Sequence, residues 1–324
     1  MKKRLIAAAV CLAVLLSLGA GLVSVLGRAD GRIRVAGNTG TVAIIAINGT
    51  IVSGRAGAGL FSTGTGSEEV MEQLRRASRD PAIKAVVLRL NSPGGTAAGA
   101  QEIAAEVDRL RKSGRKVVAS MGDTAASGAY WIASRADKIV ANPGTLTGSI
   151  GVIMQTQDLQ GLYGKLGINT RTFKSGPYKD MGSPNRPVTP AEQDIFQSMV
   201  DDIYDQFLHA VSEGRKMDLD RVRELADGRV YTGRQAQKLG LVDELGNLRD
   251  AVRLAGRLAG LGPEPAITEL GPRGIWPPGF LAGTFSPFRG SGNSDLPTAI
   301  WLICPPCLPP VTDGDKLVFP PSRG

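Results

Sequence analysis

Short apolar runs and segments of helical spacing alternate along the first half of this chain. Four of the apolar runs have the length of strands and lie at residues 41–47, 84–90, 116–121 and 138–142. Continuous apolar runs of this length are typical of strands that are covered on both faces. Between them, helical spacing marks residues 67–79 and the segment from Ile103 to Leu110, and a further helix is expected to begin near Ala126. This alternation predicts an α/β fold with parallel strands and right-handed crossovers.

The second half of the chain is more helical. One long helix is expected from an apolar stripe that comprises Phe196, Met199, Val200, Ile203, Phe207 and Val211. His209 is the only histidine of the chain and falls off this stripe, so we expect it at a solvated helix position. After Gly262 the chain is rich in proline and glycine without a sustained period, which indicates an irregular extension.

The N-terminal segment has the features of a membrane anchor. Basic residues at positions 2–4 precede an uncharged, largely apolar run from Leu5 to Leu26. About 20 apolar residues are enough to cross the hydrocarbon core of a bilayer. We therefore expect a single-pass anchor in the cell membrane, with a cytoplasmic N-terminus and the rest of the chain on the outer face. The alternative is a cleaved signal peptide, for which residues 27–29 offer only a poor cleavage site.

These patterns divide the chain into four parts. We expect the N-terminus and anchor at 1–27, a polar, glycine-rich linker at 28–40, a folded domain at 41–262 and the Pro/Gly-rich extension at 263–324.

Composition and charge limit the classes of partner that we expect the chain to bind. The formal net charge is +8, but no block of Lys and Arg is interleaved with aromatic residues, so we expect no nucleic-acid partner. A basic surface beside an anionic membrane is the simpler account of the charge. The extension contains Cys304-Pro-Pro-Cys307, which suits a disulfide in an oxidising compartment but lacks the second ligand pair of a metal site.

Three glycine-containing turns follow three of the predicted strands. They are "NSPGG" (91–95), the turn at Ser127-Gly128, and "TLTGSIG" (145–151). Sites in open α/β sheets form at the carboxyl ends of strands, so these turns are expected to converge. The backbone N–H groups of Gly94 and Gly128 could then form an oxyanion hole, or the glycines only make tight turns.

Ser127 allows two interpretations. Small residues flank it on both sides, as they flank a nucleophile on a tight strand-to-helix turn. Serine is also a good helix N-cap.

A nucleophilic serine needs a base, and no usable histidine is present, which points to lysine. Base action near pH 7–8 requires the pKa of a lysine to fall by roughly 3 units, or about 4 kcal/mol. The loop "FKSGPYKDMGSP" (173–184) offers Lys174 and Lys179, and spacing alone does not choose between them.

The chain resembles signal peptide peptidases of the SppA type, which share the ClpP/crotonase fold. The resemblance covers about residues 41–260 and rests on five motifs in the family's order: "NSPGG", "ASGAYWIA", "TLTGSIGVI", "KSGPYKDMGSP" and "DGRVYTGRQAQKLGLVDELG". It implies a serine endopeptidase that acts through an acyl-enzyme with a Ser-Lys dyad and without cofactor or metal. Ser127 would be the nucleophile and Lys179 the base, positioned by Ser149, with Gly94 and Gly128 as the oxyanion hole.

The resemblance also implies partners and an assembly. Family members of this kind are membrane-bound and degrade apolar peptides, in particular signal peptides left after secretion. Only one copy of each motif is present, as in the family's short form, in which several subunits assemble and the serine meets the lysine across a subunit boundary. One departure is Ala129, where many relatives have a second glycine; alanine is small, so activity is expected to persist.

Two other functions remain open on the sequence. A crotonase-type acyl-CoA enzyme would use the same amides for a thioester oxygen, but the expected outer location argues against it because CoA is cytosolic. A non-catalytic membrane scaffold of the same fold is the other, and the presence of Ser127, Lys179 and Ser149 together argues against it. The C-terminal extension could cover the active-site opening as a regulator.

Overall fold

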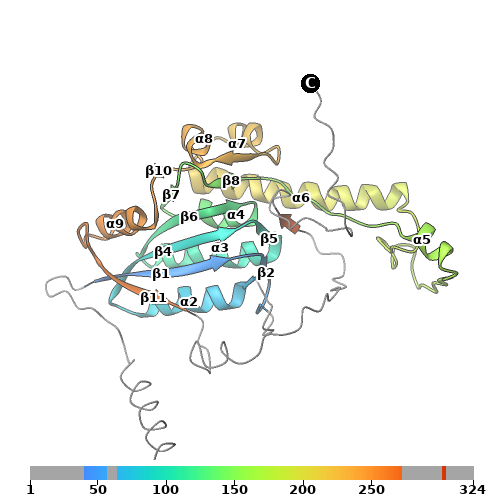
Figure 1. Cartoon of the computed structure of the whole chain (residues 1–324), viewed down its shortest axis with the longest axis horizontal. Helices are drawn as coiled ribbons and strands as arrows, with labels where there is room; N and C mark the ends of the chain where they lie inside the picture. The colour runs from blue at the N-terminus through green and yellow to red at the C-terminus, as the bar shows by residue number, and fades with distance from the viewer. Residues whose placement is uncertain (1–39, 57–63, 272–300, 304–324) are drawn as a thin grey trace, which may run out of the picture.

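A parallel β-sheet forms the centre of the molecule. The computed structural model describes residues 40–56, 64–271 and 301–303 of the chain. The main path of the sheet consists of β1 (Thr41–Asn48), β4 (Ile83–Ser92), β6 (Lys116–Ala126), β7 (Lys138–Ala141), β10 (Glu244–Leu245) and β11 (Ala266–Leu270). Their spatial order is β10-β7-β6-β4-β1-β11, and every pairing along this path is parallel. The predicted α/β class with parallel strands is thus confirmed (Figure 1).

Shorter strands extend the sheet where the glycine-rich turns lie. β8 (Leu146–Gly148) pairs in parallel with the end of β6, and β9 (Val230–Thr232) pairs antiparallel with β8. A second, small sheet has the order β12-β5-β2-β3. It is made of β2 (Ile51–Val52), β3 (Thr65–Gly66), β5 (Gly94–Thr96) and β12 (Trp301–Ile303).

Helices cover both faces of the main sheet. The helices of the described residues are α2 (Ser67–Arg79), α3 (Ala97–Lys112), α4 (Gly128–Ser134), α5 (Gln160–Lys165), α6 (Pro190–Arg215), α7 (Leu219–Leu225), α8 (Gly233–Lys238) and α9 (Leu248–Leu258). Along β4, Val86 and Leu88 belong to the core that contains α2, α3 and α4, whereas Ala85 and Val87 belong to the core beneath α9. Because side chains of a strand alternate between faces, this explains the continuous apolar run in the sequence.

The four predicted strands and the helix predicted at 67–79 are present, and several of them end at other residues than predicted. α2 spans the predicted 67–79, whereas β6 continues five residues past the predicted end at Met121 and α4 begins at Gly128. The sheet also includes β11, which lies beyond the expected domain end at Gly262.

The long helix α6 is buried over only part of its apolar stripe. Phe207 and Val211 are buried in the core, but Met199, in the first half of the helix, is 39% exposed. Figure 1 shows this first half of α6 extending past the sheet, toward a projecting segment that carries α5. We call residues 154–188 the arm.

The predicted anchor and linker and the Cys304–Cys307 pair lie outside the described residues. Among the residues that the structure describes, no helix combines the length and apolarity needed to cross a membrane.

Candidate active site

Ser127 occupies a sharp turn between β6 and α4. Its backbone has φ 54° and ψ −121°, a conformation that favours glycine and is costly for a residue with a side chain. Its N–H donates to the carbonyl of Gly148 at 2.8 Å, and its carbonyl accepts from the N–H of Trp131 at 2.9 Å. The serine stands at the N-cap position of α4, yet its side chain makes no capping hydrogen bond. The capping interpretation is therefore wrong, and the geometry is that of a nucleophile elbow.

Ser149 lies on a second strained turn beside the first. It follows β8, its φ is 48°, and its N–H donates to the carbonyl of Arg229 at 2.9 Å. The ends of the two strands are in register, with Ala126 opposite Gly148. Both serines are nearly buried, at 1% exposure for Ser127 and 5% for Ser149. The sheet therefore places two serines with positive φ next to each other.

The third turn lies close by, at the end of β4. Ser92 pairs with Ala125 of β6, so β5 begins beside the turn that carries Ser127. Gly94 has φ 108°, which favours glycine, and its N–H donates to the Ser92 hydroxyl at 3.1 Å. A carbonyl oxygen of a substrate would have to compete with this hydroxyl for the Gly94 amide.

Gly128, the other expected oxyanion donor, is the first residue of α4 and is buried. The first N–H groups of a helix have no partner within the helix and lie at the positive end of its dipole. Ala129, where many relatives have glycine, is fully buried in the core.

The C-terminal strand β12 pairs with the glycine-rich edge of this site. It runs antiparallel to β5, with Ile303 opposite Gly94 and Leu302 opposite Gly95. An extended peptide that adds to an exposed strand in this way is a common mode of peptide recognition. In this structure β12 takes that position on β5, beside Gly94 and Gly95.

Lys179 lies on the arm. The residue is exposed, and among the described residues its ammonium has no hydrogen bond or ion pair. Lys174 differs, because its Nζ lies 2.7 Å from the Asp180 carboxylate and 2.9 Å from the carbonyl of Pro177. Of the two candidate bases, Lys174 is thus engaged by a carboxylate, whereas the Lys179 ammonium has no such partner among the described residues.

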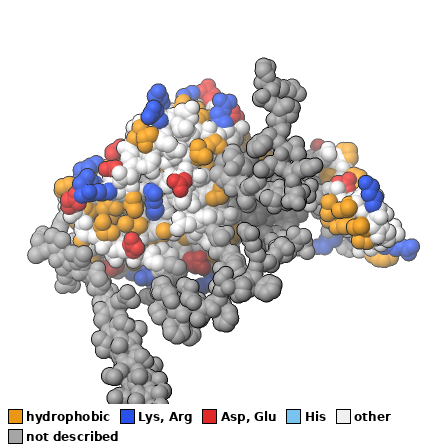
Figure 2. Space-filling model, viewed as in Figure 1, with side chains coloured by type: hydrophobic (Ala, Val, Ile, Leu, Met, Phe, Trp, Pro, Cys, Tyr) orange, Lys and Arg blue, Asp and Glu red, His pale blue; other side chains and the backbone are white. Residues whose placement is uncertain are grey.

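The arm projects from the sheet and exposes apolar side chains. Figure 2 shows them grouped on the lobe at the right. The large apolar residues of the arm that are about half or more exposed are Leu162, Leu166, Ile168, Phe173 and Tyr178. Phe173 is 95% exposed, which is unusual for an aromatic residue in a monomer and typical of an interface.

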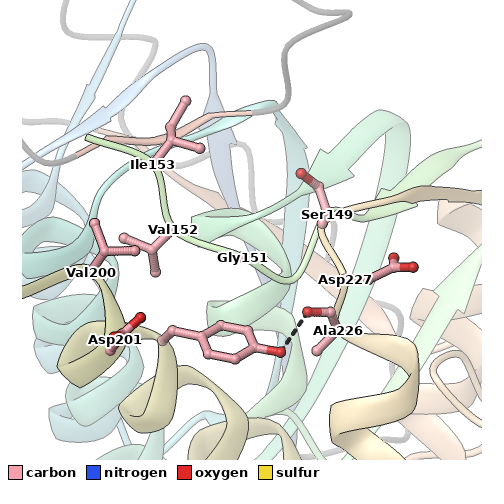
Figure 3. Close-up of a pocket in the computed structure, with 10 residues that line it drawn as sticks. Ser149, Gly151, Val152, Ile153, Val200, Asp201, Ala226 and Asp227 are labelled. Atoms are coloured by element: carbon pink, nitrogen blue, oxygen red, sulfur yellow. Dashed lines mark hydrogen bonds between the residues drawn. The ribbon is translucent and has the colours of Figure 1, made fainter. Parts of the chain in front are cut away.

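A cavity of about 300 Å³ opens next to Ser149 (Figure 3). Figure 3 shows Val152 and Val200 together on one side of it and Ser149 on the other. The Tyr204 hydroxyl donates to the carbonyl of Ala226 at 2.7 Å, which fixes the ring in the cavity wall. This cavity could not be predicted from the sequence, because α6 and residues 226–228 reach it from distant parts of the chain.

His209 stands on α6, as expected. Its side chain is 55% exposed and lies 3.5 Å from the Asp205 carboxylate, one turn earlier. The prediction of a solvated helix position is confirmed.

Comparison with known proteins finds similar proteases. The model of peptidase family S49 matches residues 109–262. A putative protease of Synechocystis is 43% identical over 200 residues, which cover 62% of this chain and 72% of that protein. A putative signal peptide peptidase SppA of Enterococcus faecium is 43% identical over 185 residues, 57% of this chain and 54% of that protein. Protease 4 of Salmonella typhi is 34% identical over 291 residues, which cover 86% of this chain but only 44% of that protein.

Proposed function

The chain belongs to peptidase family S49 and is a serine peptidase of the SppA type, and from this premise we propose that it cleaves peptides with a Ser127–Lys179 dyad. The observation that carries this assignment is the backbone of Ser127. Glycine would adopt this strained turn between a strand and a helix at a lower cost than serine, and the Ser127 side chain makes no capping hydrogen bond. A structural role therefore does not explain the serine.

We propose that the dyad forms between two copies of the chain. Lys179 is exposed on a projecting arm, whereas Ser127 is buried beside the sheet. A lysine acts as a base only where burial lowers its pKa, so Lys179 needs a surface that covers it. The exposed apolar residues of the arm and of the first half of α6 provide a surface on which a second copy would pack. A head-to-tail contact of this kind generates a ring when the rotation closes.

In the reaction, the amine of Lys179 takes the proton of the Ser127 hydroxyl as the oxygen attacks the peptide carbonyl. The Ser149 hydroxyl orients the amine, and the amides of Gly94 and Gly128 bind the oxyanion. Lys179 then passes the proton to the leaving amine. A water molecule, deprotonated by Lys179, hydrolyses the acyl-enzyme and releases the serine.

The substrates we propose are extended apolar peptides, including signal peptides left after secretion. The cavity beside Ser149 supports this class, because Val152, Val200 and the Tyr204 ring give it an apolar wall that suits an aliphatic side chain. With the expected anchor at residues 5–26, the reaction would take place on the outer face of the membrane.

Complementation of two inactive variants tests the shared dyad. Ser127→Ala and Lys179→Ala should each abolish peptide hydrolysis. When the two variants are co-expressed, a site that combines Ser127 of one copy with Lys179 of the other is intact. Random mixing in a head-to-tail ring would then restore about a quarter of the wild-type activity.

The controls test separately which lysine is the base and whether the dyad forms within one chain or between two. Lys174→Ala should retain most of the activity, since Lys174 is occupied by Asp180. If co-expression restores nothing although the mixed particles form, the dyad lies within one chain. Full activity of Lys179→Ala would overturn the assignment of the base.

A further inference from the structure

The loop that carries Lys179 is held by a cluster of four charged side chains. Arg186 binds the Asp180 carboxylate through two nitrogens, with Nε 3.1 Å and Nη2 2.8 Å from its two oxygens. Lys174 occupies the same carboxylate from the other side at 2.7 Å. The pKa of Asp180 is held well below its usual range, most by hydrogen bonds from the Arg186 guanidinium and next by the hydrogen bond from the Lys174 ammonium. Asp180, the residue after Lys179, is therefore fixed in place as an anion.

Arg186 connects this loop to the start of α6. Its guanidinium also binds Glu192, with nitrogen–oxygen distances of 2.5 and 2.9 Å, and the Glu192 side chain is only 2% exposed. Glu192 in turn accepts from the N–H of Thr189 at 2.9 Å, and the Thr189 hydroxyl accepts from the N–H of Glu192. This pair is the capping box of α6, so Arg186 links the loop to one end of a rigid helix.

The arrangement has two consequences for Lys179. Lys179 directly precedes Asp180, and its ammonium is not one of the two cations paired with the cluster's carboxylates. The cluster contains two cations and two carboxylates, and each carboxylate is paired. Asp180 is therefore already paired and does not hold the Lys179 ammonium.

We propose that Asp180 and Arg186 are positioning residues for the base: they fix the loop on α6 so that the Lys179 amine is presented to Ser127. The proposal rests on the proposed function and adds that the accuracy of the dyad is set by this cluster. A displacement of a reacting group by about 1 Å costs roughly 100-fold in rate, so a loosened loop is sufficient to disable the base.

The test uses Asp180→Asn and Arg186→Gln in the full-length protein, with Arg186→Lys as the conservative variant. Arg253→Gln is the matched control, because it breaks an ion pair with Glu264 on the opposite face of the sheet. For each variant we would measure kcat and KM on an apolar peptide, the rate at which a fluorophosphonate probe labels Ser127, the solution mass and Tm.

We expect both variants to lower kcat and the labelling rate by roughly 100-fold, with KM within about two-fold and the mass unchanged. Arg186→Lys should not rescue, since an ammonium cannot bind two carboxylates with a planar fork. Lys179→Ala should also slow the labelling of Ser127, and adding Arg186→Gln to it should lower the labelling rate no further, because Arg186 acts through Lys179.

Other results would overturn the proposal. Unchanged kcat and labelling in Asp180→Asn and Arg186→Gln, with Lys179→Ala inactive, would refute the positioning role and leave the dyad standing. A loss of activity that follows a loss of mass or Tm would show that the cluster only maintains the arm or the assembly. Full activity of Lys179→Ala would instead refute the proposed function itself.

Discussion

Replacing Ser127 by glycine should abolish activity but make the protein more stable than the alanine variant. The φ of 54° and ψ of −121° at this residue lie in a region that glycine reaches freely and other residues rarely adopt. Strain of this kind costs about 1–3 kcal/mol. Glycine loses about 0.5–1 kcal/mol more than alanine through backbone entropy on folding. The difference leaves Ser127→Gly more stable than Ser127→Ala by about 1 kcal/mol.

The comparison with alanine isolates the effect of backbone strain on stability, because both variants lack the hydroxyl. For a domain of this size, about 1 kcal/mol corresponds to roughly 2–4 °C in Tm. Thermal unfolding and the urea midpoint, with an unchanged m value, would measure the difference. If Ser127→Gly is no more stable than Ser127→Ala, the turn is not strained, and the argument that identifies the nucleophile from its backbone is refuted.

Three further predictions concern other parts of the site. A stop codon after Gly271 removes β12 from the edge of β5 and should raise the rate of peptide cleavage; an unchanged rate would mean that β12 does not compete with substrate. Gly95→Ala places a Cβ 1.9 Å from a backbone oxygen of β2 and should lower the free energy of unfolding by about 1–3 kcal/mol, whereas Gly144→Ala meets no atom within 4 Å and should be neutral in a urea titration. Arg186 lowers the pKa of Glu192 to about 2, so its ion pair stabilises the arm above the ordinary glutamate pKa of about 4.3 and is lost as the pH falls toward 2. Limited proteolysis of the arm should accelerate over this range in the wild type, whereas in Arg186→Gln the rate of cleavage should no longer change over this range.

Much of the fold follows from local patterns. The predicted strands appear because the apolar runs need cover on both faces, and α9 supplies the face that α2, α3 and α4 leave open. The turns could also be located, since glycine and small residues at 94–95 and 127–129 permit conformations that larger residues resist. Ser127 itself remained ambiguous between nucleophile and cap, because both need the same residue at the same place.

The apolar stripe of α6 shows where pattern and burial separate. Helical spacing predicts one continuous buried face, but the sheet ends before the helix does, so Met199 is left exposed. The sequence shows that this face of α6 is apolar, but it does not show which surface covers the face. For the first half of α6 and for the arm, we propose that a second copy of the chain provides that surface.

Four central strands, the three glycine-rich turns and the candidate residues of the chemistry could be located from the sequence alone, because these depend on periodicity and on backbone sterics within a few residues. Only the tertiary structure decided that Ser127 does not cap α4, that Lys174 is bound by Asp180, and that β12 pairs with β5. Each of these depends on side chains or strands that meet in space. Such contacts cannot be read from the sequence, because they depend on the backbone geometry of the turn and of the arm and on which strands pair in the folded protein.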